Sequence, residues 1–358
     1  MLTRLAASNF RLFAELSLDL TPGINLVVGA NAAGKTTVLE AAYTLGRGRS
    51  FRGEPRDLAG RAGADWTVSG TWRGDHGGER LGGIGWTAAG GLHARLDRAD
   101  VPLHELAQAL AVEVLEPDSH RLLEDGPAYR RRYLDWGVFH VEHRFFPAWR
   151  RYRQALRQRN AALRTGADDM QVHSWEPELA AAGEEVDACR RAQVERLRQA
   201  VRSPLRTLLG EAEVSLELAR GWSADESLAD SLRRHLDGDR QAGLTRQGPH
   251  RAELRMIFGD RAARHHVSRG QQKMLIAALL LAQAELVGQA TGSRPLLLVD
   301  DFPAELGPPF QAALLEALRA YGGQVLLTAI EQAHALESIE KNAVFHVEHG
   351  SLRRPLRV

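Results

Sequence analysis

The sequence predicts an α/β fold: an ATP-binding-cassette type of P-loop head, with a mixed β-sheet and flanking helices, interrupted by an inserted helical arm. A glycine-bounded loop at 29–36 separates an apolar run from a helical pattern, and a second apolar run, 296–299, ends in two aspartates. Between them, residues 129–209 repeat apolar side chains at helical spacing. We expect a first head segment, the arm and a second head segment at 1–110, 111–240 and 241–358.

The N-terminal segment predicts two strands and then a strand–loop–helix unit. Apolar and polar residues alternate from Leu2 to Leu20, which is typical of two short strands. They are expected to meet around residues 8–9 or 13–14 and to end at the turn 21–23. The run Ile24–Val28 predicts a buried strand, and residues 38–42 predict the helix that follows the loop. This order is the context that a phosphate-binding P-loop requires.

The loop itself has the spacing G-x-x-x-x-G-K-T. Gly29 and Gly34 permit a tight turn, so that successive N–H groups converge on a phosphate at the start of the helix. Lys35 would reach the terminal phosphates, and the Thr36 hydroxyl would coordinate Mg²⁺. The alternative is a plain glycine turn with a surface lysine, which the flanking strand and helix disfavour. We therefore expect a nucleoside triphosphate to bind Gly29, Ala30, Asn31, Ala32, Ala33, Gly34, Lys35, Thr36 and Thr37.

The segment after the first helix predicts a loop and an antiparallel sheet. Residues 46–53 are basic and too rich in glycine for regular structure. Residues 65–101 hold short runs with Trp, Thr, Val and Ile, broken by pairs of glycines. These runs are typical of antiparallel strands rather than of a second βαβ unit.

The predicted arm carries an excess of arginine. Residues 129–165 contain ten arginines and two acids, although the whole chain has a net charge of only +1. A polar turn at 165–169 joins this stretch to a second helical pattern, 177–209, so an antiparallel helical pair is expected. The arginines indicate either a nucleic-acid or protein-partner surface or a solvated helix face. The candidate contacts are Arg130, Arg131, Arg132, Arg150, Arg151, Arg153 and Arg157.

The C-terminal part supplies acids and a second anion site. Asp300, after a buried parallel strand, would hold Mg²⁺, and Asp301 would orient the attacking water. A Ser-x-Gly-Gln stretch, comprising Ser268, Gly270 and Gln271, precedes a helix expected over 274–290. Because the P-loop already holds the nucleotide in its own chain, this second site would serve the terminal phosphate of a partner copy. A plain helix cap is the alternative.

The composition argues against several other classes of protein. The single cysteine, Cys189, rules out a disulfide framework and a thiolate zinc site within the chain. No secretory pattern opens the sequence, and no apolar run is expected to be long enough for a membrane span. We expect a reducing cytoplasm and no membrane partner.

Three of these motifs together resemble those of a known type of ATPase head. The P-loop, the Ser-x-Gly-Gln helix and the acid-ended strand look like the ATP-binding-cassette head of transporters, SMC proteins and repair ATPases. More narrowly, the chain resembles the RecF family of bacterial DNA repair and replication-gap proteins over nearly its whole length. The blocks that carry this resemblance are residues 9–11, 29–41, 49–52, 130–136, 248–251, 268–273 and 297–302.

The resemblance implies an SMC-like head that binds ATP and Mg²⁺ between two copies. One copy would contribute Lys35, Thr36, Asp300 and Asp301, and the other Ser268, Gly270 and Gln271. Family members are similar in dimerising on ATP and binding duplex DNA near single-strand gaps. They hydrolyse ATP slowly, as a DNA-stimulated switch, and act with RecR and RecO to place RecA on gapped DNA.

The sequence departs from the family pattern in three places and from the transporter pattern in a fourth. Gly307 stands where an acid is expected after the paired aspartates, and Ala252 follows the Gly-Pro-His-Arg block in place of Asp. Residues 115–119 differ from the usual Pro-Glu-Asp, so no Mg²⁺-sensing residue is assigned there. Thr328 replaces the switch histidine of transporters and cannot act as a base.

Two other functions fit parts of the sequence. A P-loop kinase or phosphotransferase acting on a small molecule would use Ser268 only as a helix cap, and it would not dimerise on nucleotide. A transporter's energising subunit is disfavoured by the long arm and by the missing switch histidine.

Overall fold

The computed structural model divides into two compact units. The head unit comprises Met1–Ser119, Ser203–Gly210 and Arg269–Val358, and the arm unit comprises His120–Arg202 and Glu211–Ser268. These limits differ from the expected boundaries at 110 and 240, because strand β8 pairs within a head sheet and the β9–β10 pair packs with arm helices. Within these units, the structure describes residues 1–60, 64–74, 78–259, 261–262, 268–302, 307–330 and 343–353.

The first head sheet is antiparallel, in the order β2-β1-β4-β5-β6-β7. It confirms the two N-terminal strands, whose turn falls at residues 11–12, and the strands predicted over 65–101. Its strands are β1 (Leu2–Phe10), β2 (Phe13–Asp19), β4 (Trp66–Arg73), β5 (Glu79–Thr87), β6 (Gly91–Leu96) and β7 (Ala99–Val101).

The second head sheet has the order β15-β14-β3-β13-β12-β8 and is parallel except for β15. Strands β3, β12 and β13 are buried along their whole length, as continuous apolar runs in a covered parallel sheet should be. The strands are β3 (Ile24–Val28), β8 (Val112–Leu115), β12 (Leu296–Val299), β13 (Val325–Ala329), β14 (Ala343–Glu348) and β15 (Ser351–Arg353).

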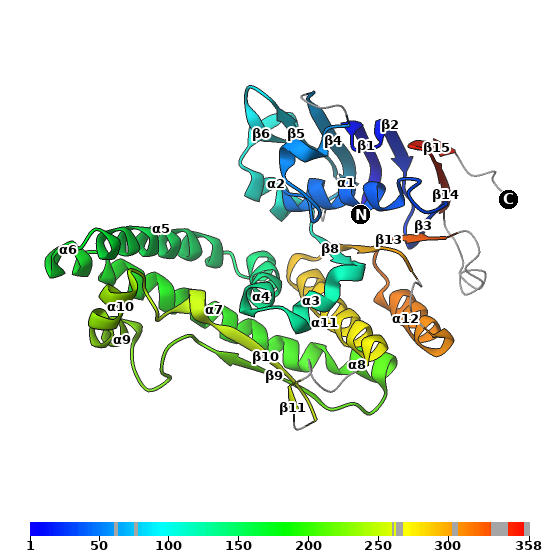
Figure 1. Ribbon diagram of the computed structural model, residues 1–358. Coiled ribbons are helices and arrows are strands. Elements are labelled where there is room, and N and C mark those ends of the chain that lie inside the picture. The colour runs from blue at the N-terminus through cyan, green and yellow to red at the C-terminus, as the bar shows by residue number, and fades with distance from the viewer. Residues whose placement is uncertain are drawn as a thin grey trace. The chain divides into compact units, whose positions relative to one another are not determined.

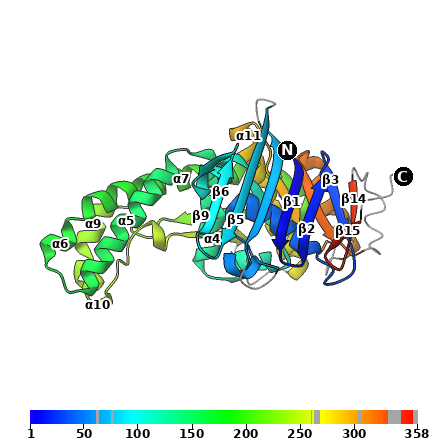
Figure 2. The ribbon, with the colours of Figure 1, turned by 90° about the horizontal axis from the view of Figure 1, so that it is seen from above.

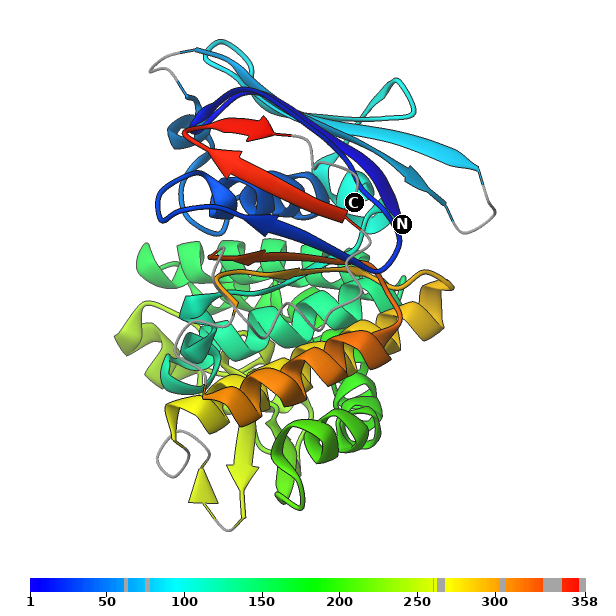
Figure 3. The ribbon, with the colours of Figure 1, turned by 90° about the vertical axis from the view of Figure 1, so that its right-hand side faces the viewer.

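Helix α1 lies between the two sheets, and α11 and α12 cover the opposite face of the second one (Figure 3). The head helices are α1 (Lys35–Arg47), α2 (Leu103–Ala109), α8 (Arg202–Leu209), α11 (Arg269–Thr291) and α12 (Pro308–Tyr321), with 3₁₀ turns at Pro55–Leu58 and Pro117–His120. The predicted P-loop-type head fold, with its mixed sheet and flanking helices, is confirmed.

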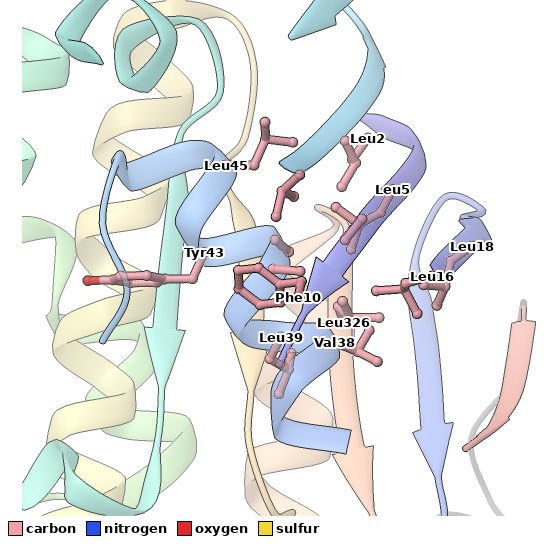
Figure 4. Close-up of a cluster of buried hydrophobic side chains, with 14 of the residues drawn as sticks. Leu2, Leu5, Phe10, Leu16, Leu18, Val38, Leu39, Tyr43, Leu45 and Leu326 are labelled. Carbon is pink, nitrogen blue, oxygen red and sulfur yellow. The ribbon is translucent and has the colours of Figure 1, made fainter. Parts of the chain in front are cut away.

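The head core forms where α1 faces both sheets. Figure 4 shows these side chains converging from β1, β2, α1 and β13. Fully burying one such side chain contributes about 1.5–3 kcal/mol, so this cluster fixes α1, and with it the P-loop, against both sheets. The labelled residues are Leu2, Leu5, Phe10, Leu16, Leu18, Val38, Leu39, Tyr43, Leu45 and Leu326.

Helix α11 corrects one expectation. It is long and apolar enough to cross a membrane by length and composition, whereas no apolar run of that length was expected. Its most apolar 18-residue window is 67% buried inside the protein, however. The apolar surface of α11 thus packs in the head, which is the usual place of such a helix in a core.

The arm unit contains a long antiparallel helical pair, α5 and α7, with α6 at its end (Figures 1 and 2). The single helix expected over 129–165 is in fact two helices, α4 and α5. If α4 continued through Pro147, the proline ring would collide with the backbone carbonyl group one turn earlier. The arm elements are α3 (Arg121–Glu124), α4 (Pro127–Val141), α5 (Phe145–Arg164), α6 (Asp169–His173), α7 (Glu176–Ala200), α9 (Leu228–Arg234), α10 (Leu236–Ala242), a 3₁₀ turn at Pro249–Arg251, β9 (Val214–Ala219), β10 (Glu253–Phe258) and β11 (Arg261–Ala262).

Candidate nucleotide site and basic arm surface

The P-loop connects β3 to α1. At two of its positions only a glycine fits the backbone. A Cβ atom at Gly29 would collide with the Val347 carbonyl oxygen, and Gly34 has a φ of 117°. Gly34 precedes α1, whose first turn carries neither a capping side chain nor an acid. The N-terminal N–H groups of α1 are therefore available to an anion, as the spacing predicts.

The nine predicted P-loop residues form this one turn. Lys35 is buried, and its Nζ donates to the carbonyl oxygens of Gly29 (2.9 Å) and Ala30 (3.0 Å). Thr36 is half-buried at the start of α1. The other positions are either exposed in the loop (Ala30, Asn31 and Ala32) or buried (Gly29, Ala33, Gly34 and Thr37).

The structure brings Thr36 and Asp300 together across the second sheet. Asp300 follows β12, and its Oδ1 accepts a hydrogen bond from the Thr36 hydroxyl at 3.1 Å. Thr328, on the neighbouring strand β13, donates to the same Oδ1 at 2.8 Å and accepts from the Asp301 N–H at 2.8 Å. A buried threonine thus holds both aspartates, a role that the sequence did not suggest.

The site fits a divalent cation. Burial raises the pKa of Asp300, the two threonine hydroxyls lower it, and the neighbouring charge of Asp301 raises it. Neither aspartate forms an ion pair with a described residue, and no cluster of three metal-binding acids or histidines occurs among those residues. Mg²⁺ would therefore take Thr36 and Asp300 as protein ligands and complete its shell with phosphate and water oxygens.

The Ser-x-Gly-Gln stretch opens α11. The helix begins at Arg269, five residues earlier than expected, and its first turn carries no acid. Ser268 is exposed, and Gln271 is half-buried. A Cβ at Gly270 would lie 3.1 Å from the Phe310 ring on α12, so glycine keeps this turn close to its neighbour. The segment thus places Ser268, Gly270 and Gln271 at the start of a long helix whose first turn carries no acid.

A buried network that the sequence did not reveal fixes the loop after α1. Glu40 is fully buried and accepts two hydrogen bonds from Arg11, at 3.1 and 2.7 Å, and one from the Ser50 hydroxyl. Ser50 Oγ in turn accepts from the backbone N–H of Arg52. The charge of Arg52 lowers the pKa of Asp300, which places this basic loop within electrostatic range of the aspartates. The blocks 9–11 and 49–52 are thus joined through α1.

Comparisons with known proteins identify this arrangement. A family model described as an AAA domain matches residues 4–46. The DNA replication and repair protein RecF of Chromohalobacter salexigens is 43% identical, over 98% of this chain and 99% of its own length. RecF of Edwardsiella ictaluri is 40% identical with the same coverage of both chains. The chain belongs to the RecF family.

Solved structures agree on the fold. A structure of the recombination mediator RecF with ATPrS, in the RecFOR pathway, superposes with a TM-score of 0.89 at 23% identity, covering 99% of this chain and 98% of that one. An SMC head bound to the C-terminal winged-helix domain of ScpA gives a TM-score of 0.60 at 12% identity, covering 99% and 97%. The RecF-family chain therefore has the SMC-like head that the sequence predicts.

The positions that depart from the family pattern have local roles here. Gly307 is the N-cap residue of α12, and residues 303–306 before it lie outside the described part of the chain. Leu115, at the end of β8, accepts a hydrogen bond from the Asp300 N–H. After the Gly-Pro-His-Arg block, Ala252 is buried, and Glu253 binds Arg130.

The seven candidate arginines of the arm fall into two groups. Arg130 is buried in an ion pair with Glu253 (2.6 Å) and also donates to three carbonyl oxygens of the α3 region. Arg131 is half-buried, donates to the Ala252 carbonyl, and has a pKa lowered by burial. Arg151 is paired with two glutamates of α7. These three therefore hold the arm together.

The other four arginines are exposed. Arg132 lies over the Tyr129 ring, with 5.4 Å between its guanidinium carbon and the ring centroid. Arg150, Arg153 and Arg157 project from α5, and none forms an ion pair with a described residue. Burial and pairing thus separate two uses of arginine that a charge count could not distinguish.

Proposed function

We propose that this RecF-family chain is an ATP-dependent DNA-binding protein of replication and repair. The observation that carries the proposal is the convergence of Lys35, Thr36 and Asp300 at the P-loop, in a chain whose Ser-x-Gly-Gln stretch opens α11 with no acid in the first turn. The family relationship and the exposed arginines of the arm support DNA as the macromolecular ligand.

ATP is sandwiched between two copies in this proposal. One copy holds the triphosphate with the P-loop N–H groups and Lys35. Ser268 and Gly270 of a second copy, assisted by Gln271, meet the terminal phosphate with a hydroxyl and backbone N–H groups. The nucleotide then acts as a bridge, so dimerisation requires ATP and ends with its hydrolysis.

Hydrolysis depends mainly on positioning. Lys35 places positive charge beside the transferred phosphoryl group, and Mg²⁺, when held by Thr36 and Asp300, neutralises charge on the phosphates. Asp301 orients the attacking water, and its main chain is fixed by the Thr328 hydroxyl. A buried threonine cannot replace a histidine as a base, which is consistent with slow, DNA-stimulated turnover that times release.

The proposed setting is a gapped chromosome in the cytoplasm. The ATP-bound dimer binds duplex DNA close to a single-strand junction, and the exposed Arg132, Arg150, Arg153 and Arg157 are the candidate DNA contacts of the arm. It acts there with RecR and RecO, and so indirectly with RecA, the partners implied by the family and by the RecFOR pathway named for its structural relative.

The test is fluorescence anisotropy of a labelled gapped duplex, titrated with the protein in ATP, in ADP or without nucleotide, at two salt concentrations. We expect tight binding only with ATP, and an affinity that falls steeply with salt because phosphate contacts release counterions. An intact duplex without a gap serves as the control for junction preference.

Two results would contradict the proposal. Equal affinity for the gapped duplex in ATP and in ADP would show that the bound nucleotide does not control DNA binding. No binding in any nucleotide, together with a monomer in ATP, would favour a small-molecule P-loop kinase instead.

A further inference from the structure

One face of α5 combines exposed arginines with half-buried aromatic rings. Each of the residues Phe146, Trp149, Arg150, Arg153 and Arg157 lies three or four positions from at least one other member of the set, so they lie along the same side of the helix. We call this set the α5 ridge. Between Arg150 and Arg157 the helix rises by about 10 Å.

The charge of the α5 ridge is uncompensated within the described structure. Arg150, Arg153 and Arg157 have no acidic partner there, although Arg151, on the same helix, binds Glu178 and Glu185. Three like charges held side by side repel one another, and the arm supplies acids only to the neighbouring face. Such a surface favours a polyanionic ligand.

The aromatic rings are arranged as a stack. The Phe146 and Trp149 rings are nearly parallel, with 17° between their planes and 6.3 Å between centroids. Arg153 lies over the Trp149 ring at 4.8 Å, and Arg150 lies over Phe146 at 5.9 Å. Stacked rings with guanidinium groups beside them are the elements that bind unpaired bases and their phosphates.

The surface beside the stack is hollowed and contains no acid. The hollow, of about 570 Å³, is lined only by α5 residues, with Trp149 and the three ridge arginines joined by Pro147, Arg151 and Gln154. A duplex would meet the arginines with its phosphates but would keep its base faces inside its own stack. Only a single strand offers phosphates and exposed base faces together.

We propose that the α5 ridge binds single-stranded DNA, with one base stacked beside Trp149 and the flanking phosphates held by Arg150, Arg153 and Arg157. The proposal deepens the proposed function and rests on its claim that DNA is the ligand. It assigns the unpaired strand of a junction to the arm, independently of whether the head binds nucleotide.

The first test measures binding of a labelled 20-nucleotide oligo-dT in ADP. We expect the triple variant R150A/R153A/R157A to bind at least tenfold more weakly, with a salt slope reduced by about two, because each single-strand phosphate contact contributes about 0.7. R95A/R196A/R233A is the matched control. It also removes three exposed arginines, but each of these is paired with an acid (Asp100, Glu142 and Asp230) and none lines the hollow, so the affinity should stay within twofold.

The second test isolates the aromatic stack. W149A should weaken oligo-dT binding about tenfold or more, the size of one base–aromatic stack, and W149F should retain most of the affinity. Against an abasic strand or a blunt duplex of equal length, W149A and the wild type should bind alike, because neither ligand offers an accessible base face.

Several outcomes would overturn the proposal. Equal losses of affinity in the R95A/R196A/R233A control and in the triple ridge variant would show that only the net charge of the protein matters. If W149A lost the same share of its affinity for oligo-dT, for the abasic strand and for the blunt duplex, the Trp149 ring would have only a structural role. Full retention of oligo-dT binding by every variant would reassign the ridge to an acidic protein partner. Because the assay is run in ADP, the absence of an ATP-dependent dimer in the wild-type protein would leave these results unchanged and would count only against the proposed function.

Discussion

The head and the arm leave opposite charges without a partner. In the head, Asp300 and Asp301 meet hydroxyl groups but no described cation, whereas basic residues nearby are engaged elsewhere, as Arg11 is with Glu40. In the arm, the buried acids Glu176 and Asp239 are paired with Arg159, whereas Arg153 and Arg157 have no acidic partner among the described residues. Each unit thus retains the charge opposite to that of its proposed ligand, a metal cation in the head and phosphates in the arm.

The difference shows that burial decides the role of a charged residue more than its type does. Arg157 and Arg159 are two positions apart on α5. Arg159 is fully buried and binds Glu176 (2.9 Å) and Asp239 (2.7 Å), whereas Arg157 is exposed. A fully paired buried arginine specifies structure, and an exposed unpaired one is available to bind.

The largest expected effect is in the head. Asp301→Asn should lower ATP hydrolysis by about a hundredfold or more, because the amide cannot accept the proton of the attacking water. ATP binding should be retained, and the ATP-bound dimer should live longer. Single-turnover hydrolysis and a nucleotide-binding titration measure both quantities. An unchanged hydrolysis rate would show that Asp301 is not the residue that orients the water.

The next prediction compares the two neighbouring arginines of α5. Arg159→Ala should lower the free energy of unfolding by about 3–5 kcal/mol, since it leaves the buried Asp239 carboxylate without an ion pair and Glu176 with His173 alone. Arg157→Ala should change it by no more than about 0.5 kcal/mol. Urea unfolding followed by circular dichroism tests the pair. Similar midpoints for the two variants would remove the distinction between buried and exposed arginines on which the comparison depends.

A smaller effect concerns pH and the head. Burial raises the pKa of Glu113 to about 7, although Arg47 pulls it down. The folded state therefore holds a proton that the unfolded state releases above its ordinary pKa near 4.5, so the head loses stability as pH rises toward and through 7.

Glu113→Gln removes this titration. The variant should be more stable than the wild type at pH 8, by an amount on the order of 3 kcal/mol, and nearly equal to it at pH 5. Thermal unfolding at the two pH values measures the difference. A variant that is less stable at pH 8 would show that the ion pair with Arg47 outweighs the cost of burying the carboxylate.

Local patterns made much of the head predictable. The P-loop, the acid-ended strand and the helix after Ser268 each combine a turn or cap with an apolar run, and these features are set by neighbours in the sequence. The contacts of Thr328 and Glu40 could not be predicted in the same way. They join residues 28 and 29 positions apart through the packing of β13, β12 and α1, which no local pattern records.

The arm was predictable in outline only. Helical spacing indicated the α5–α7 pair. The break between α4 and α5 depends on the single residue Pro147, and the helical spacing around it does not reveal that break. Among the candidate arginines, charge alone could not separate the buried Arg130 from the exposed Arg153, because the acidic partner of Arg130, Glu253, comes from a distant segment. Pairing between distant segments is fixed by the fold.

The central claim is that two copies share ATP through Ser268, and sedimentation velocity of the wild type and of Ser268→Arg in ATP tests it most directly. The wild type should form a dimer in ATP but not in ADP. The variant should stay monomeric in ATP while binding a fluorescent ATP analogue normally, because its P-loop is intact, and Ser268→Ala should show an intermediate dimer affinity. A Ser268→Arg protein that dimerises with ATP as the wild type does would contradict the account.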